Sequence, residues 1–381
     1  MNTIIPFNKP HMTGKEVHYI NDAFTTGHIS GNGKYTKLCQ RYFEERWGFK
    51  KTLLTTSCTD ALEMCALLIN IQTGDEVIIP SYTFVSTALA FVRQGAKIVF
   101  ADSRNDRPCL DENSLESLIT YKTKAIVPVH YAGVACDMNK IMEVANKYNL
   151  FVIEDAAQAI ESYYSDNLGI KKPLGTIGHL AAFSFHETKN IQSGEGGLLA
   201  INDERFITRA EIIWEKGTNR AEFFRGEVNK YGWVDLGSSF LPSEIIAAFL
   251  WAQLENLDII QNIRKKIWNY YHNFFTNLNS ELVNLPNIPV YATNNAHMYY
   301  LICKNSEIRT KLISEMKKEN IYPVFHYLSL HKSEFYFKKH DGRNLPFADL
   351  YSDTLVRLPL FVDLTEDEIQ RITYIIGNIL S

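Results

Sequence analysis

One lysine in this chain has neighbours that would suit a reactive amine. Lys189 stands in the stretch FSFHETKNIQSGEGG (183–197), after the hydroxyl of Ser184 and before a glycine-rich turn at 194–197. A lysine amine can form an imine with a carbonyl compound, and glycines let the backbone turn tightly or approach a ligand. Because any single lysine is more often a solvated loop residue, the rest of the sequence has to decide.

A carboxylate and an amide follow the apolar run in FVIEDAAQA (151–159). Asp155 and Gln158 come just beyond a predicted buried strand, where a carboxylate is costly unless it has a partner. Asp155 could cap the next turn, or it could pair with a cationic ring nitrogen or a metal. The adjacent Glu154 would point to the opposite face of a continuing strand, which argues against a metal site shared by both acids.

Hydroxyl groups open a predicted helix in TTSCTDAL (55–62). Ser57 and Thr59, with the free backbone N–H groups of a helix start, would form an anion site. Taken alone, these residues are better explained as an ordinary helix cap. Taken with the acid and the lysine, they meet the needs of pyridoxal phosphate: a helix N-terminus for the phosphate, a carboxylate for the pyridinium and an amine for the imine.

The elements that would position these groups alternate between about residues 52 and 202. Short, mostly continuous apolar runs predict strands buried on both faces, and the segments between them predict helices. This alternation predicts a mostly parallel sheet covered by helices, in which sites collect at the carboxyl ends of strands. The predicted strands are 76–80, 97–100, 125–130, 150–155, 181–185 and 196–201, and the predicted helices are 57–70, 83–94, 111–120 and 137–148.

The pattern changes after residue 202. Pro242 stands near the start of a long helical pattern, as proline does at helix starts. We expect a large cofactor-binding domain at 1–245, and a linking helix with a small C-terminal domain at 246–381. The predicted elements of the later part are helices at 203–216 and 306–319, the long helical pattern at 242–275 and a strand at 297–303.

The composition of the chain argues against several classes of binding partner. The 381 residues are 46% hydrophobic and carry a net charge of −4, which gives no general attraction to nucleic acid or an anionic membrane. No apolar run approaches the roughly 20 residues of a membrane helix. The six cysteines include no CxxC pair, so we expect reduced thiols and no metal site. These features predict a soluble cytoplasmic protein without a nucleic-acid or membrane partner.

The order of the motifs SCTDAL, PSYTF, EDAAQ, FSFHETKN and GEGG resembles the DegT/DnrJ/EryC1/StrS sugar aminotransferases, a family of fold-type I pyridoxal-phosphate enzymes. The resemblance runs through nearly the whole chain. It is closer still to the members that make dTDP-4-amino-4,6-dideoxygalactose, through PSYTFVSTA, VPVHYAGVAC, GTIGH, AEIIWEKGTNR and FFRGEVNKY. It implies an α/β fold, with a large, mostly parallel sheet domain that has helices on both faces, and a smaller α+β C-terminal domain.

The resemblance also assigns roles to residues. Lys189 would be the Schiff-base lysine, Asp155 would pair with the pyridine nitrogen, and Gln158 would contact the phenolic oxygen of the ring. Other matching positions would hold the phosphate (Ser57, Cys58, Thr59 and Ser184) or stack on the ring (Phe84). Phe84 could equally be a core residue.

Two positions depart from the family pattern. Many relatives carry glycine at the position of Cys58, where backbone contact alone would survive the change. Many also carry an asparagine that reaches the phosphate of the neighbouring subunit, at the position that Ser239 takes in the turn GSSF.

The implied reaction moves an amino group from L-glutamate to C4 of dTDP-4-keto-6-deoxy-D-glucose. The product would be dTDP-4-amino-4,6-dideoxy-D-galactose, used for O-antigen or another surface polysaccharide, and the enzyme would be a homodimer. Candidates for contacts with the sugar nucleotide, each of which could equally be a packing or surface residue, are Tyr131, Arg220, His326 and His331.

Alternatives remain at this stage. The same chemistry could give the 4-amino-4,6-dideoxy-D-glucose epimer or aminate C3 of a 3-keto sugar, and no motif separates these outcomes. A sugar dehydratase of the same family would carry histidine in place of Lys189. A binding protein without activity would not need Lys189, Asp155 and Gln158 together.

Overall fold

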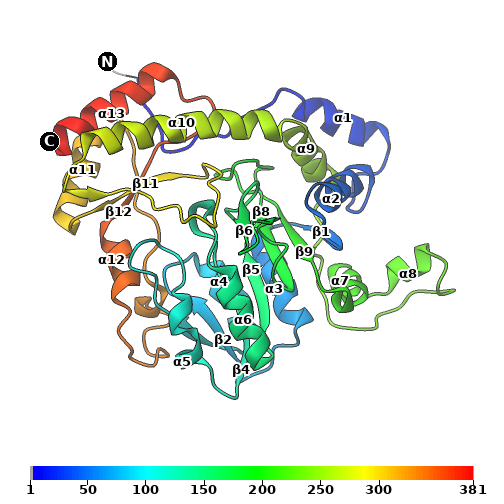
Figure 1. Ribbon diagram of the computed structural model, residues 1–381. Coiled ribbons are helices and arrows are strands. Elements are labelled where there is room, and N and C mark those ends of the chain that lie inside the picture. The colour runs from blue at the N-terminus through cyan, green and yellow to red at the C-terminus, as the bar shows by residue number, and fades with distance from the viewer. Residues whose placement is uncertain (1–2, 381) are drawn as a thin grey trace.

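A seven-stranded sheet forms the centre of the computed structural model, which describes residues 3–380 (Figure 1). The strand order is β1-β9-β8-β5-β4-β2-β3, and only β9 runs antiparallel to its neighbours. The sheet is therefore mostly parallel, as the sequence predicted. Its strands are β1 (Lys51–Thr55), β2 (Glu76–Pro80), β3 (Lys97–Ala101), β4 (Thr123–Ile126), β5 (Phe151–Asp155), β8 (Leu180–Ser184) and β9 (Gly197–Ile201).

Helices connect these strands where the pattern predicted them. α3 (Cys58–Leu68), α4 (Val85–Val92) and α6 (Met138–Tyr148) confirm three of the predicted helices. Asp137 caps α6 by accepting a hydrogen bond from the Lys140 amide, and Asn149 ends it in the left-handed conformation. The predicted helix at 111–120 is wrong in its extent, because only a 3₁₀ turn (Glu112–Ser114) and α5 (Leu115–Leu118) form there.

Two further predictions fail for local reasons. The strand predicted at 125–130 ends at Ile126, since Pro128 has no N–H for a strand ladder. The helical pattern at 242–275 forms two helices, α9 (Glu244–Glu255) and α10 (Leu257–Leu278). Asn256 separates them, and its side-chain amide donates to the Ala252 carbonyl. Such local bonding by asparagine competes with regular helix hydrogen bonding.

A second, smaller core lies beyond the large sheet. β10 (Val283–Asn284), β11 (Tyr299–Cys303) and β12 (Leu355–Leu358) form an antiparallel sheet, which α11 (Ser306–Lys318), α12 (Pro346–Thr354) and α13 (Glu366–Leu380) accompany. The predicted strand near 297–303 and helix near 306–319 are confirmed. Residues of this core include Ile5, Tyr271, Leu301, Val356 and Ile372. Because the first core also includes C-terminal residues, the predicted division at 245 stays a prediction.

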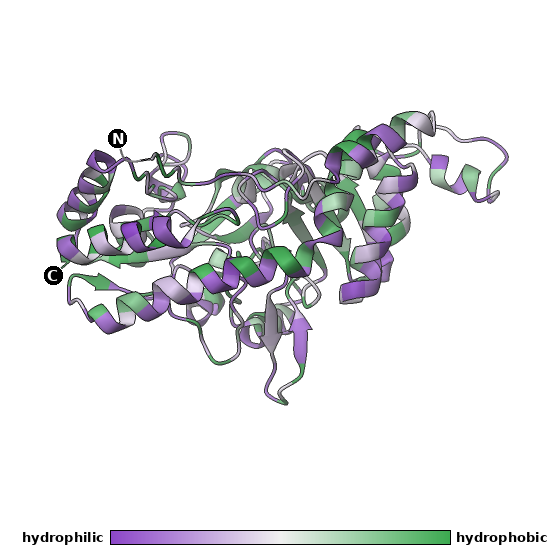
Figure 2. Ribbon diagram, turned by 90° about the horizontal axis from the view of Figure 1, so that it is seen from above, coloured by the Kyte–Doolittle hydropathy of each residue, from purple (hydrophilic) through white to green (hydrophobic). Residues whose placement is uncertain are grey.

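One segment projects from the body. It follows α7 (Ile207–Trp214), carries α8 (Arg220–Phe224) and returns before α9 (Figures 1 and 2). We call residues 216–239 the arm. The remaining elements are α1 (Glu16–Thr25) and α2 (Lys34–Trp47), which pack with α9, and the hairpin of β6 (Tyr163–Ser165) and β7 (Lys171–Pro173).

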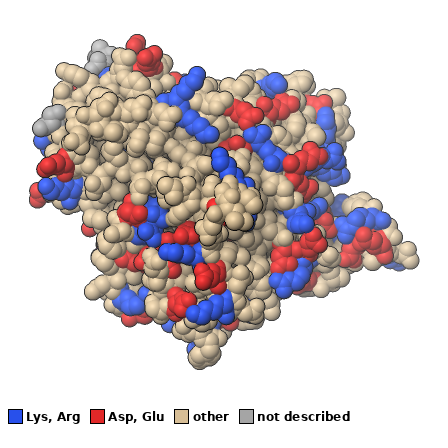
Figure 3. Space-filling view, viewed as in Figure 1, with Lys and Arg blue, Asp and Glu red and all other residues tan. Residues whose placement is uncertain are grey.

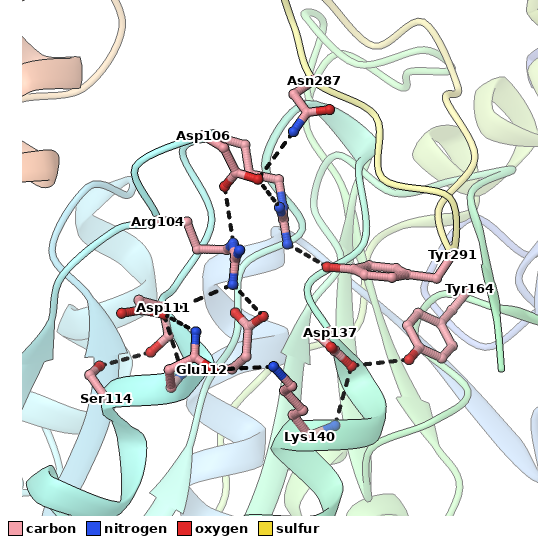
Figure 4. A network of polar contacts seen from close by, with 12 residues as sticks. Arg104, Asp106, Asp111, Glu112, Ser114, Asp137, Lys140, Tyr164, Asn287 and Tyr291 are labelled. Carbon is pink, nitrogen blue, oxygen red and sulfur yellow. Dashed lines mark hydrogen bonds and ion pairs between the residues drawn. The ribbon is translucent and has the colours of Figure 1, made fainter. Parts of the chain in front are cut away.

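Polar contacts tie the loop after β3 to the segment before β11 (Figure 4). The Asp106 carboxylate accepts from Arg104 at 3.0 Å, from Arg107 at 2.7 Å and from Asn287 at 3.1 Å. Arg107 also donates to the Tyr291 hydroxyl. These bonds help to fix the C-terminal part against the large sheet.

The surface carries charges of both signs. On the face shown in Figure 3, lysine and arginine side chains are interspersed with aspartate and glutamate, and no broad patch of one sign covers it. Among the helices of residues 3–380, none has both the length and the apolar character that a membrane span requires.

Candidate active site

Strand register brings the predicted site residues to one edge of the large sheet. Thr55 at the end of β1 pairs with Gly197, and Gly197 pairs with Ser184 at the end of β8. Asp155 at the end of β5 pairs with Ala182, also on β8. The carboxyl ends of β1, β5 and β8 therefore meet, as the strand-end rule predicted.

A cavity of about 770 Å³ opens at this edge. This volume lies within the range of roughly 300–1,000 Å³ that is usual for sites of drug-sized ligands. Of the residues singled out from the sequence, nine line it: Ser57, Cys58, Thr59, Phe84, Asp155, Gln158, Ser184, Lys189 and His326.

The Lys189 amine faces the cavity without a protein partner. It makes no hydrogen bond or ion pair with any residue between 3 and 380. Burial lowers the pKa of Lys189, because the charged amine loses hydration, while the nearby Cys58 and Asp155 oppose this shift. A larger share of the amine is therefore neutral near pH 7, which is the form that acts as a nucleophile or base.

Asp155 is a buried acid, 5% exposed. Its Oδ2 accepts from the Thr87 hydroxyl at 2.7 Å, and its Oδ1 accepts from the Ala157 amide at 3.2 Å. Burial raises the pKa of Asp155, and these hydrogen bonds together with Lys189 oppose the rise. No cationic side chain of the described chain lies within ion-pair distance of it, so the carboxylate suits a cation brought by a ligand.

The start of α3 is capped by a side chain, and its remaining amides suit an anion. Ser57 Oγ accepts from the Asp60 amide at 3.1 Å, which is the ordinary capping bond. The first amides of a helix have no acceptor within the helix, and here they border the cavity. By contrast, the start of α2 is filled by the Glu244 carboxylate, which accepts from the amides of Gly33 and Tyr35 at 3.0 and 2.7 Å.

Steric crowding explains why the last residue of the GEGG turn, Gly197, is a glycine. A Cβ built on Gly197 would lie 2.3 Å from the carbonyl carbon of Ser57 and 2.4 Å from the nitrogen of Cys58. Only glycine lets β9 begin this close to the start of α3. The turn thus brings Ser184, on the neighbouring strand, to the same side of the cavity as Ser57.

Gln158 is held at both ends of its amide. Its Oε1 accepts from the Ala132 amide at 2.6 Å, and its Nε2 donates to the Tyr327 hydroxyl at 2.9 Å. Phe84 stands across from Tyr327, with ring centroids 6.0 Å apart. Because Phe84 is 55% exposed and lines the cavity, the alternative that it is a core residue is wrong.

Glu154 points away from the cavity, as strand alternation predicted. It accepts from His130 Nε2 at 2.8 Å, and from the amides of Gly175, Ile177 and Gly178 at 2.6 to 2.8 Å. Glu154 therefore has a structural role, because these hydrogen bonds fix the loop that leads into β8.

The four candidates for sugar contacts lie in different places in the structure, and only His326 lines the cavity. His326 lines the cavity, and Tyr131 lies buried behind it, its hydroxyl 2.6 Å from His326 Nδ1. His331 lies outside the lining, with its Nδ1 bonded to Ser81 Oγ at 2.7 Å. Arg220 and Ser239 lie on the exposed arm, where Arg220 pairs with Glu215 at 3.6 Å. Roles for these three residues stay predictions.

Sequence reasoning missed several residues of the cavity. Thr87 and Tyr327 support Asp155 and Gln158 from other elements, a relation that no local pattern reveals. His297 is buried beside the cavity, with its Nδ1 2.8 Å from Asn190 Oδ1, and burial holds its pKa well below the usual value. Arg357 did leave a signal, since it is a charge inside the apolar run LVRLPL.

The donor set fits pyridoxal phosphate. An open helix start with hydroxyls, a buried acid without a cationic partner and an amine with a lowered pKa face one cavity. Ser57, Thr59 and Ser184 would hold the phosphate, Asp155 the ring nitrogen, and Lys189 the carbonyl carbon.

Comparison with known proteins agrees with this chemistry. Residues 10–376 match the model of the DegT/DnrJ/EryC1/StrS aminotransferase family. The spore coat polysaccharide biosynthesis protein SpsC of Bacillus subtilis is 30% identical, covering 100% of this chain and 98% of SpsC. The uncharacterized protein MJ1066 of Methanocaldococcus jannaschii is 31% identical, and the match covers 100% of this chain and 98% of MJ1066. The putative sugar aminotransferase Spr1654 from Streptococcus pneumoniae, in its PMP form, superposes with a TM-score of 0.89 at 25% identity over 98% of each chain.

Proposed function

The chain belongs to the DegT/DnrJ/EryC1/StrS family of pyridoxal-phosphate-dependent aminotransferases, and from this premise we propose its substrates. The amino donor is L-glutamate, and the acceptor is C4 of dTDP-4-keto-6-deoxy-D-glucose. The product is dTDP-4-amino-4,6-dideoxy-D-galactose, made in the cytoplasm for a surface polysaccharide. Motifs along the whole chain that resemble enzymes of this reaction support the proposal, as does the polysaccharide role named for SpsC.

One observation carries the proposed chemistry. Lys189 is a buried amine with a lowered pKa and Asp155 is a buried acid, and both face one cavity without forming an ion pair with each other. This arrangement costs stability in a protein without a ligand, because the buried amine has no hydrogen-bond partner and the buried carboxylate has hydrogen bonds but no cation beside it. The arrangement is useful when a cofactor joins the two groups.

The residues divide the work as follows. Pyridoxal phosphate, when bound, supplies an electron-poor ring that stabilises negative charge at the α-carbon of the donor. With the cofactor bound, Asp155 would keep the ring nitrogen protonated, Gln158 would contact the ring oxygen and Phe84 would stack on the ring. Lys189, as a free amine, takes the proton from the α-carbon of glutamate, and in the second half-reaction it returns a proton to C4 of the sugar.

The proposed enzyme is a homodimer. Apolar side chains stand exposed on the arm, among them Phe224 at 68% and Trp233 at 81%. Exposed apolar groups gathered on one segment mark a surface that another protein covers. We propose that a second copy covers this surface and that Ser239, at the position of the family's asparagine, is directed to the partner's cofactor site.

The test is the product. Purified enzyme is incubated with dTDP-4-keto-6-deoxy-D-glucose and L-glutamate, and the C4 configuration of the aminosugar is read by NMR. An axial nitrogen is expected. An equatorial nitrogen would assign the gluco epimer, and turnover with a 3-keto sugar alone would assign C3; either result overturns the proposed product.

A variant links this activity to the site. Lys189→Ala is expected to abolish transfer and to remove the visible absorbance band of the protein-bound cofactor. A matched control is Lys338→Ala, which removes an exposed lysine outside the cavity lining. Full activity in Lys189→Ala would contradict the assignment of the lysine.

A further inference from the structure

A buried network of side-chain amides ends at a histidine of the cavity. Gln261, on α10, donates from Nε2 to the Ile160 carbonyl at 3.4 Å, so its Oε1 is the atom that accepts from Asn190 Nδ2 at 2.8 Å. Asn190 Nδ2 also donates to the Asn295 carbonyl at 2.9 Å, which leaves Asn190 Oδ1 facing His297 Nδ1 at 2.8 Å. Because a backbone carbonyl can only accept, each of the two amides has a single orientation.

This orientation fixes the tautomer of His297. Asn190 Oδ1 is an acceptor, so Nδ1 of His297 carries the hydrogen, and Nε2 of the neutral ring carries a lone pair. Burial holds the pKa of His297 well below its usual value, and nearby cations, Lys189 among them, add to the shift. The ring is therefore neutral near pH 7, with Nε2 as a hydrogen-bond acceptor.

The free acceptor belongs to the wall of the cavity. His297 is 7% exposed and lines the cavity, and its Nε2 makes no hydrogen bond to any residue between 3 and 380. The other two histidines of the lining differ from it. In His186, Nδ1 accepts from the Thr188 amide at 3.3 Å, so the free Nε2 of a neutral ring is a donor. In His326, Nδ1 faces the Tyr131 hydroxyl, which can donate or accept.

Lys189 is the donor that this acceptor suits. It precedes Asn190 in the chain, so the amide network holds the backbone of the lysine and the His297 ring in a fixed relation. Its amine offers N–H groups on a flexible stem and has no partner in the described chain. Asp155, the acid whose charge acts on Lys189, already accepts two hydrogen bonds.

We propose that His297 is a positioning residue for Lys189: with the cofactor in place, its Nε2 accepts a hydrogen bond from the unattached amine and aims the lone pair of that amine at the α-carbon of the donor. The inference rests on the proposed aminotransferase function, since it assigns the group that orients the base of that reaction. The proton taken from the α-carbon stays on Lys189, and His297 gains none. The same hydrogen bond then stabilises the ammonium form of the lysine.

Two substitutions separate this role from simple bracing of the network. His297→Asn keeps a side-chain N–H at the place of Nδ1 and has no atom at the place of Nε2. His297→Gln keeps an acceptor at the place of Nε2 and loses the N–H that bonds to Asn190. If His297 only braced Asn190, His297→Asn would behave as the wild type and His297→Gln would be impaired. The proposal predicts the reverse order.

The reactivity of Lys189 tests the contact without turnover. The full chain is loaded with 4′-deoxypyridoxine phosphate, a cofactor analogue that has no aldehyde, and methylation of Lys189 by formaldehyde and a hydride donor is followed against pH by peptide mass spectrometry. A hydrogen bond to the ammonium raises its pKa, so His297→Asn should shift the profile by about one pH unit to lower pH. His297→Gln and the exposed control His18→Asn, outside the cavity lining, should keep the wild-type profile.

The other titratable or charged groups that face the pair stay the same in all three variants: Cys58, Asp155, Arg264, His326 and Arg357. A difference between the profiles therefore reports on Nε2 itself. An unshifted profile in His297→Asn, or an equal shift in His297→Gln, would overturn the proposal.

Single-turnover absorbance of the holoenzyme with L-glutamate measures the effect on the reaction. A misaimed base predicts that His297→Asn lowers the rate at saturating glutamate by about tenfold or more, and that the half-saturating concentration is unchanged, because His297 does not bind the donor. His297→Gln should retain most of the rate, and the reverse order would overturn the proposal. Failure of the proposed function has a different sign: the wild type would not convert with glutamate, while the methylation profiles would still report on the contact.

Discussion

The Thr87 hydroxyl donates to Oδ2 of Asp155 at 2.7 Å, from α4 to the end of β5. Thr83 Oγ lies 3.0 Å from the same hydroxyl. Since Thr87 has a single hydroxyl hydrogen and uses it on Asp155, Thr83 is the donor in the second bond. The pair of threonines thus orients the carboxylate and stabilises its charged form.

Removing the hydroxyl of Thr87 should shift the pH dependence of the reaction. Thr87 lowers the pKa of Asp155, so Thr87→Val raises this pKa further above the ordinary value. Because Asp155 must be ionised to pair with a ring cation, activity in the variant is expected to fall at a higher pH than in the wild type. The acidic limb of kcat/KM against pH measures this; Thr87→Ser keeps the hydroxyl and should keep the limb.

The lowered pKa of Lys189 predicts unusual reactivity in the cofactor-free protein. Lysine reacts only as a neutral amine, so Lys189 should be methylated by formaldehyde and a hydride donor at lower pH than an ordinary lysine. Asp155→Asn removes a negative charge that raises the pKa of Lys189, so in this variant Lys189 should react at still lower pH. Peptide mass spectrometry follows both, with the exposed Lys338 in the same sample as reference. Equal profiles at the two lysines would contradict the prediction.

Much of the site was predictable because it follows from strand ends. Lys189 and Asp155 each follow a run predicted to be a buried strand, Ser57 opens a predicted helix, and a mostly parallel sheet brings such residues together at its strand ends. The support from Thr87 and Tyr327 was not predictable, since their partners are 68 and 169 positions away. Arg357 was overlooked because a single charge in a strand can point to solvent or to a cavity, and the sequence does not distinguish the two.

Errors in the predicted fold have the same cause, because local sequence patterns do not show tertiary contacts. Apolar periodicity continues through 242–275, whereas the structure ends one helix and begins the next at Asn256, whose side chain donates to the Ala252 carbonyl. His331 was a candidate for contacts with the sugar nucleotide, and the structure places its ring in a buried position against Ser81, outside the cavity lining. In both cases, tertiary placement decides what the residue type leaves open.

Gly197→Ala should damage both stability and cofactor binding. The added Cβ would meet the backbone between Ser57 and Cys58 at 2.3 to 2.4 Å, so the start of α3 must shift. We expect a loss of about 1–3 kcal/mol of unfolding free energy, as for other overpacked sites, and a weaker affinity for pyridoxal phosphate. Denaturant unfolding and cofactor titration measure these. The control is Gly194→Asn, at a positive φ with nothing near its Cβ position; asparagine tolerates this conformation.

Glu154→Gln should lower the free energy of unfolding, because the substitution removes acceptors from buried hydrogen bonds. The carboxylate accepts from three loop amides and from His130, whereas an amide group offers one acceptor oxygen and two donors. Buried N–H groups left unpaired cost about 1–3 kcal/mol each. Denaturant unfolding is expected to reveal a loss in this range or above it. The exposed Glu204→Gln is the matched control, and an equal effect in both variants would exclude the role given to Glu154.

A charge on the arm should separate the proposed dimer. Trp233 is 81% exposed, near the exposed Tyr231, Val234 and Leu236. Burying a glutamate in an apolar interface without a partner is costly, so Trp233→Glu is expected to favour the free subunit. Sedimentation should give twice the chain mass of 43.7 kDa for the wild type and the single mass for the variant. Tyr121→Glu, at an exposed aromatic residue on a separate loop, should remain dimeric. If the wild type itself sediments as a monomer at micromolar concentration, then Ser239 cannot reach a partner's phosphate, and each cavity must work with the residues of one chain.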